Sequence, residues 1–142
     1  MKILVPVDGS TESLDAVRHA LALVRDGLRA SLVLANVQAP ASLYELLRVH
    51  DAQAIEAIAR GAGAHLLQEA SALCSAAAVE YDQEIASGEP VHKLLDIAEE
   101  EGCGLIVMGA RGKGDTSGTR LGSVAHALLH DAHLPVTIVR HA

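Results

Sequence analysis

The sequence predicts an α/β fold of Rossmann-like, three-layer α/β/α architecture, in which helices cover both faces of a five-stranded parallel sheet. The first observation is that short aliphatic runs alternate strictly with helical patterns, five runs with four patterns. The second is the length of 142 residues, which suits one compact domain with a sizeable core. The third is that no linker, internal repeat or low-complexity tract interrupts the alternation. Residues 1–142 are therefore expected to form a single domain.

The first strand and the first helix are expected at the start of the chain. Ile3 to Val7 is a short aliphatic run, and apolar residues at spacings of three and four follow it. Ser10 or Thr11 can cap this helix, and Gly27 can close it. The next run, Leu32 to Val37, is nearly all aliphatic, which is typical of a strand that is covered on both faces.

A longer helix is expected after residues 38–50, a segment that contains Pro40 and shows no clean periodicity. Gly61 and Gly63 are expected to weaken the middle of this helix, because glycine is a poor helix former. The side chains predicted to share its inward face are those of Ile55, Ile58, Ala62, Leu66, Ala70, Leu73 and Ala77.

The second half of the chain is expected to begin with an edge strand. Val79 to Ala86 alternates between apolar and charged side chains, which indicates a half-buried strand at an edge of the sheet. Pro90 is expected to begin a short helix that ends before Gly102. The acidic run Glu99 to Glu101 is interpreted as a solvated face and not as a metal site. The remaining expected elements are a strand, a helix and a strand over Leu105 to Met108, Ser123 to about Asp131, and Val136 to Val139.

Composition and charge disfavour several classes of partner. With 11 basic and 18 acidic residues the net charge is −7, and nucleic acid or an anionic membrane would repel such a protein. No apolar run approaches the roughly 18 residues of a membrane span, and the first residues do not form a signal peptide, so a cytoplasmic location is expected. Cys74 and Cys103 form no C-x-x-C motif and are expected to be buried thiols. Phe and Trp are absent, so aliphatic side chains are expected to fill the core.

The stretch from Cys103 to Val124 contains the clearest functional pattern, an aliphatic run followed by a glycine-rich loop and the start of a helix. Glycines let a backbone approach a ligand closely, and a helix N-terminus presents unpaired N–H groups to an anion. Arg111, Lys113 and Arg120 add the positive charge that polyphosphate binding favours, and Ser123 is expected at the N-cap of the helix. The pattern predicts a phosphate loop, with a simple tight strand-to-helix turn as the alternative.

The glycine spacing excludes two common nucleotide-binding motifs. Gly112-Lys113 is followed by Gly114 and not by Ser or Thr, so the loop is not a Walker A motif. The spacing of Gly112, Gly114 and Gly118 is G-x-G-x-x-x-G, and these residues lie far from the first strand. The loop is therefore not the dinucleotide-binding fingerprint either.

The glycines instead follow the spacing Gly109, two residues, Gly112, nine residues, Gly122-Ser123, which resembles the ATP-binding signature of the universal stress protein family. The resemblance extends over the whole chain, from the opening I-L-V-P-V-D-G-S to the closing L-P-V-T-I-V-R. It implies the strand order 3-2-1-4-5, in which the first and fourth strands are neighbours. Asp8 and the glycine loop would then face one crevice at the carboxyl ends of the strands.

The resemblance also implies an ATP site, residue by residue. Val7 and Asp8 match the adenine side, where the Asp8 carboxylate would accept from adenine or ribose, although a carboxylate at this point can also merely cap the next helix. Val37 matches the residue whose backbone binds adenine, and Met108 and Gly109 match the residues that flank the ribose. The residues implied to hold the phosphates are Arg111, Gly112, Gly122, Ser123, Val124 and Ala125.

Two functional classes remain open. The first is a nucleotide-dependent regulatory protein of the stress response, in which ATP selects one conformation. The resemblance implies that it is a homodimer, which pairs through Val136 to Val139. The second class is a slow ATPase or phosphoryl-transfer enzyme, with Ser123 as a candidate Mg²⁺ contact and Asp115 or Thr116 within reach of the γ-phosphate. No catalytic base with a partner is evident, so binding is favoured and no catalytic residues are predicted.

His126 and His130 stand four residues apart, with His133 beyond them, which is a spacing that a metal site can use. Asp131 is the only acid close by in the sequence, and it is expected to point off that face. Surface histidines are therefore the preferred interpretation, and no metal is predicted.

Overall fold

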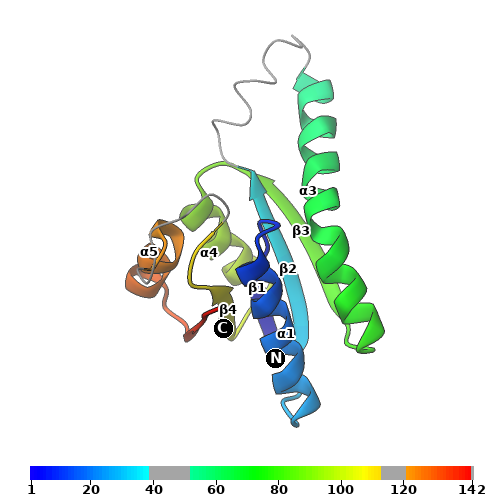
Figure 1. Ribbon diagram of the computed structural model, residues 1–142. Coiled ribbons are helices and arrows are strands. Elements are labelled where there is room, and N and C mark those ends of the chain that lie inside the picture. The colour runs from blue at the N-terminus through cyan, green and yellow to red at the C-terminus, as the bar shows by residue number, and fades with distance from the viewer. Residues whose placement is uncertain (39–51, 113–120, 142) are drawn as a thin grey trace.

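The computed structural model describes residues 1–38, 52–112 and 121–141 as alternating strands and helices (Figure 1). The strands form one parallel sheet of order β3-β2-β1-β4-β5, so the predicted fold class and strand order are confirmed. In chain order the elements are β1 (Lys2–Pro6), α1 (Thr11–Arg25), β2 (Ser31–Gln38), α3 (Ala52–Ala76), β3 (Tyr81–Ser87), α4 (Pro90–Glu100), β4 (Leu105–Gly109), α5 (Ser123–Asp131) and β5 (Val136–Val139).

Two aliphatic cores hold the three layers together. Figure 1 shows α1 and α3 on one face of the sheet and α4 and α5 on the other. Successive residues of β1 alternate between the cores, since Ile3 and Val5 face α1 and α3 while Leu4 faces α4 and α5. Each aliphatic side chain that is fully buried in this way stabilises the fold by about 1.5–3 kcal/mol. Among the described residues, no helix combines the length and the apolar character that a membrane span requires.

The ends of α1 and α4 follow the signals in the sequence. Ser10 is the N-cap of α1, and its side chain accepts a hydrogen bond of 3.1 Å from the N–H of Ser13. Pro90 is the first residue of α4, where its missing N–H leaves no helical hydrogen bond unmade. The carboxylate of Glu89 caps this helix by accepting from the N–H groups of Val91 and His92. Both helix starts are therefore set by residues next to them in the chain.

The inward face predicted for α3 was wrong in part. Ala62 and Ala77, expected inside, are exposed, whereas Leu67 and Cys74 are fully buried together with Ala70. The helix is thus rotated toward Leu67 and Cys74 relative to the prediction. Alanine tolerates this rotation because its small side chain loses little by facing water. The other predicted inward residues in the described part of this face, Leu66 and Leu73, are half-buried at its flanks.

Gly63 has a packing role in α3 that the sequence did not predict. A Cβ atom at Gly63 would lie 2.6 Å from Cγ2 of Ile85 and 3.1 Å from Oδ1 of Asn36. Only a glycine allows the helix to approach β2 and β3 so closely. The side chains of Ile55 and Ile58, also predicted for the inward face, lie outside the described residues.

The two edges of the sheet are formed by β3 and β5. The predicted edge strand is confirmed, but it begins at Tyr81 and not at Val79. Val79 instead lies in the turn that closes α3, because its N–H donates to the carbonyl of Cys74 over 3.1 Å, after Ala78 has turned the chain with a φ of 55°. The last strand, β5, has the predicted bounds.

Candidate functional site

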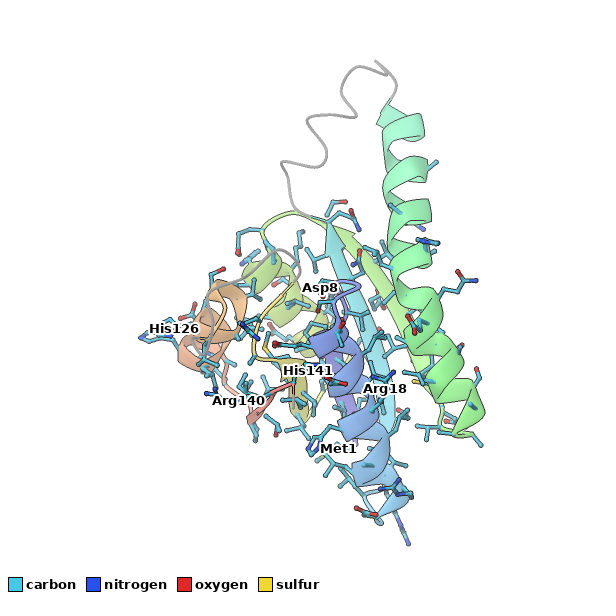
Figure 2. All side chains as sticks on the ribbon, viewed as in Figure 1. Met1, Asp8, Arg18, His126, Arg140 and His141 are labelled. Carbon is cyan, nitrogen blue, oxygen red and sulfur yellow. The ribbon has the colours of Figure 1, made fainter. Side chains whose placement is uncertain are left out.

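A pocket of about 450 Å³ lies at the carboxyl ends of β1, β2 and β4, where the strand order reverses between β1 and β4. This volume is in the range of small-molecule sites, about 300–1,000 Å³. Asp8 lies at the carboxyl end of β1 (Figure 2). The residues that the sequence predicted for the site all line this pocket: Val7, Asp8, Val37, Met108, Gly109, Arg111, Gly112, Gly122, Ser123, Val124 and Ala125.

Sequence reasoning missed the rest of the lining. Asn36 and Gln38 are polar residues at the end of an otherwise aliphatic strand, and that contrast was the one signal that could have marked them. The others are apolar or small and had no distinguishing signal before the helices were placed against the sheet. The missed lining residues are Pro6, Ser13, Ala35, Asn36, Gln38, Leu66, Pro90, Leu94 and Ala110.

The Asp8 carboxylate lies between the start of α1 and the glycine loop. Its Oδ1 accepts a hydrogen bond of 2.9 Å from the N–H of Ser10, so it braces the turn that leads into the helix. A Cβ atom at Gly112 would lie 2.7 Å from Oδ2 of Asp8, closer than two such atoms can approach. A side chain at position 112 would therefore force this carboxylate to move. The expectation that Asp8 and the loop share one crevice is met.

The ends of β1 and β2 are tied together by buried polar groups. Asn36 is buried, and its amide nitrogen donates to the carbonyl of Val7 over 2.8 Å. Gln38 donates in turn to Oδ1 of Asn36, so both ends of the Asn36 amide are bonded. The N–H of Val7 donates to the carbonyl of Ala35 over 2.8 Å. This network gives the β1 and β2 side of the pocket a defined backbone position.

The start of α5 differs from the prediction by one residue. Gly122, and not Ser123, is the N-cap, because the Gly122 carbonyl accepts the first helical hydrogen bond from His126 over 2.9 Å. Gly122 itself has no side chain with which to cap the helix. The N–H groups of Ser123, Val124 and Ala125 precede that first bond, and all three residues line the pocket. Together with the positive end of the helix dipole, they make this wall of the pocket suitable for an anion.

The two ends of the glycine loop are fastened to each other. The N–H of Gly122 donates to the carbonyl of Ala110 over 2.7 Å, and the N–H of Ala110 donates to Val139 of β5 over 2.9 Å. The start of α5 is therefore held beside the end of β4. The predicted loop residues Lys113, Asp115, Thr116 and Arg120 lie outside the described residues.

Arg111 binds an acidic side chain that the sequence analysis had not linked to the site. Its backbone N–H donates to Oε2 of Glu12 over 2.7 Å, and its Nε and Nη2 donate to Oε1 over 3.1 and 2.8 Å. Glu12 is buried in the first turn of α1. An acid at the start of a helix is favourable for the helix dipole alone, and nothing local in the sequence relates residues 99 positions apart.

The histidines of α5 lie away from the pocket. His126 and His130 are exposed, and Figure 2 shows His126 on the outer side of the helix. Nδ1 of His130 lies 2.9 Å from a carboxylate oxygen of Asp131. In the described part of the chain, no group of three or more His, Cys, Asp or Glu side chains could hold a metal ion.

Comparison with known proteins identifies the family. The model of the universal stress protein family matches residues 1–140 of the chain. The universal stress protein YxiE of Bacillus subtilis is 33% identical over 146 residues, covering 98% of this chain and 98% of YxiE. The universal stress protein MJ0531 of Methanocaldococcus jannaschii is 29% identical over 139 residues, covering 98% of this chain and 81% of the relative.

Solved structures agree with these relatives. Universal stress protein UspA from Lactobacillus plantarum has a TM-score of 0.77 at 26% identity, covering 99% of this chain and 97% of that one. A universal stress protein in complex with cAMP has a TM-score of 0.67 at 28% identity, covering 99% and 96%. A family protein from Arabidopsis thaliana with AMP bound shares the fold, with a TM-score of 0.71 at 21% identity and coverage of 100% and 92%. The chain belongs to the universal stress protein family.

Proposed function

We propose that this chain binds ATP in the pocket at the carboxyl end of the sheet and acts as a nucleotide-dependent regulatory protein of the stress response. The observation that supports this most is that two chemically different walls line the same pocket. One wall has the buried polar network of β1 and β2, and the other has the amide groups at the start of α5. An adenine nucleotide has the matching division into a base and an anionic tail.

The base and the ribose occupy the β1 and β2 side in this proposal. The backbone of Val37 binds adenine, the Asp8 carboxylate accepts from adenine or ribose, and Val7 lies beside them. Met108 and Gly109 flank the ribose. The buried bonds of Asn36 support this arrangement, since they hold the ends of β1 and β2 at one spacing.

The phosphates lie against the glycine loop and the start of α5. Gly112, Gly122, Ser123, Val124 and Ala125 provide this wall, with Arg111 at its edge. Backbone N–H groups at a helix N-terminus bind phosphate without any side-chain charge, and the dipole adds to their attraction. The universal stress protein that was solved with cAMP, at 28% identity, adds support for an adenine nucleotide as the ligand class.

The proposed assembly is a homodimer that forms through β5. The strand Val136–Val139 lies at an edge of the sheet, and its residues are all half-buried in the single chain. An edge strand offers its outer backbone groups to a copy related by a two-fold axis. Sedimentation equilibrium with and without ATP tests this proposal, and a monomer at all concentrations would contradict it.

The function is tested by isothermal titration of the nucleotide-free protein with ATP, with and without Mg²⁺, followed by chromatography of the recovered nucleotide. Saturable binding with intact ATP recovered is expected for a regulator. ADP formed at a steady rate that Ser123→Ala abolishes would favour the slow ATPase instead. If ATP does not bind under either condition, the proposed function is wrong.

The proposed division of the pocket into a base and ribose side and a phosphate side is tested with Asp8→Ala. This variant is expected to lose affinity for ATP and adenosine but to keep its affinity for tripolyphosphate, because the carboxylate serves the base and ribose. Asp26→Ala is the matched control, since Asp26 is an exposed acid at the far end of α1. An equal loss for ATP and for tripolyphosphate would contradict the role of Asp8.

A further inference from the structure

We propose that Glu12 is a positioning residue for the phosphate side of the pocket, which acts by holding Arg111 and the glycine loop in place. In this view the Arg111 guanidinium fixes the loop and does not bind the phosphates itself. The inference rests on the proposed function, because it concerns how the same pocket holds the nucleotide.

The contacts of Glu12 are unusually complete for a single carboxylate. One oxygen accepts the backbone N–H of Arg111, and the other accepts both Nε and Nη2 of the same residue. A planar guanidinium bound in this way is held in orientation as well as in distance. The backbone bond further fixes the main chain of the loop at that residue. Glu12 thus controls both the side chain and the path of the backbone at one point.

Burial explains why this pair does not open for a ligand. Glu12 is buried, so moving the guanidinium toward a phosphate would leave its carboxylate without its cationic partner. Breaking one half of a buried ion pair is strongly unfavourable. The backbone of β4 packs directly on the same turn of α1, since a Cβ at Gly109 would lie 2.9 Å from the carbonyl carbon of Glu12. The first turn of α1 is therefore packed directly against the end of β4 and bonded to Arg111.

The position of Arg111 in the loop links Glu12 to the phosphate wall. Ala110, the residue before it, accepts the N–H of Gly122, the N-cap of α5. Gly112, the residue after it, lies against the Asp8 carboxylate. A shift of the backbone at Arg111 therefore moves the start of α5 and its amide groups relative to the bound phosphates. The β1 and β2 side of the pocket is bonded separately through Asn36, so it is expected to stay in place.

The test is a double-mutant cycle read by isothermal titration with two ligands, ATP and adenosine. Glu12→Ala, Arg111→Ala and the double variant are each expected to bind ATP about tenfold more weakly than the unsubstituted chain, so that the second change adds little to the first. The affinity for adenosine is expected to change by less than about twofold, because the base side of the pocket is held by other bonds. Loss for ATP without loss for adenosine is the signature of a positioning role.

Two further variants make the test independent of general stability. Asp15→Asn is the matched control: Asp15 is another acid of α1, paired with Arg18 and His141 outside the pocket, and this variant is expected to bind ATP normally. Glu12→Gln keeps the side-chain volume and one acceptor for the Arg111 N–H. It is expected to show the same split between ATP and adenosine with a smaller loss, and it serves in place of Glu12→Ala if that variant does not fold.

Several results would overturn the inference. Tighter ATP binding by Glu12→Ala would mean that the freed Arg111 binds phosphate directly. Additive losses in the double variant, unchanged ATP affinity, or equal losses for ATP and adenosine would each contradict a positioning role. If the unsubstituted chain binds adenosine and ATP and only the cycle fails, the proposed function stands without this inference. Absence of binding in the unsubstituted chain would overturn both.

Discussion

Two ion pairs of this protein have nearly the same N···O distance but lie at opposite ends of the sheet. Arg111 and Glu12 are 2.8 Å apart beside the pocket, and Lys2 and Glu101 are 2.9 Å apart at the amino end of β1. The side chains of the first pair are 29% and 11% exposed, against 39% and 23% for the second. The pocket pair has three hydrogen bonds, one of them donated by a backbone N–H, whereas the other pair has one. Equal distances therefore do not imply equal consequences, since burial and the number of donors decide what a pair contributes.

The pair at the amino end belongs to a small group of charges. The hydrogen bond between Lys2 and Glu101 raises the pKa of the lysine and lowers that of the carboxyl. Glu84 of β3 also hydrogen-bonds to Glu101, and this contact with a second carboxyl raises the pKa of Glu84. The acidic run predicted as a solvated face is thus only partly so, because Glu99 and Glu100 are exposed while Glu101 is engaged.

The topology explains why the two ends differ. In a parallel sheet with connecting helices, every helix begins at the carboxyl ends of the strands, so the positive ends of the helix dipoles meet there. The pocket lies at that end, and the charges at the other end pair with one another. The comparison predicts that changes at the pocket end affect binding strongly, whereas equivalent changes at the amino end do not.

The largest difference between the two ends is expected from adding one methyl group at a glycine. Gly112→Ala is expected to weaken ATP binding roughly 10- to 100-fold, because its Cβ would displace the Asp8 carboxylate that lies 2.7 Å away. Gly104→Ala is the control at the amino end, where the Cβ would make an ordinary contact of 3.4 Å with Met1. Titration calorimetry of both variants checks this, and equal affinities would remove Gly112 from the site.

The next effect is on stability and compares the two acids directly. Glu12→Gln is expected to lower the free energy of unfolding by about 1–3 kcal/mol, because it weakens a largely buried, charge-assisted group of bonds. Glu101→Gln is expected to change it by less, since solvent reaches and screens this partly buried pair. Urea unfolding followed by circular dichroism measures both. A larger loss of unfolding free energy from Glu101→Gln than from Glu12→Gln would contradict this prediction.

A smaller effect is expected from pH through Glu84 of β3, which interacts with Glu101 of the amino-end pair. The pKa of Glu84 is raised in the folded chain, so its ionised form is disfavoured there and weakens the fold at neutral pH. Glu84→Gln is expected to raise the Tm by about 1–2 °C at pH 7, and the gain should vanish below about pH 4, where this carboxyl is protonated in both states. Thermal melts of both proteins at several pH values test how the difference in Tm changes with pH. A gain that grows in acid would contradict it.

The smallest effect on binding is expected from the two thiols. Burial raises the pKa of Cys74 to about 11, and burial also raises that of Cys103, which is only half-buried near Lys2. At pH 8 iodoacetamide is expected to modify Cys103 before Cys74, which should react only after unfolding. Modified protein is expected to bind ATP normally, because neither thiol lines the pocket. Mass spectrometry identifies which thiol reacts first, and titration calorimetry measures ATP binding by the modified protein. Earlier modification of Cys74, or a loss of ATP affinity, would contradict the prediction.

The elements of the fold were largely predictable because their signals are local. Ser10 and Pro90 define helix starts through groups within three residues of them in the chain. Aliphatic runs such as Leu32 to Val37 are typical of strands that are covered on both faces, and β2 is one of them. The inward face of α3 was less predictable, because alanines and glycines fit either side of a helix.

The sequence by itself determined the alternation of elements and the glycine spacing. Both follow from spacing along the chain, which hydrophobic periodicity and backbone conformation reflect directly. The predicted site residues came from the resemblance to the universal stress protein family, and they are part of the pocket lining. The pairing of Glu12 with Arg111, the tie between Asn36 and Val7, and the bond between Gly122 and Ala110 were decided only by the tertiary structure. These contacts join segments from different elements, and only packing against the sheet brings their atoms within hydrogen-bonding distance.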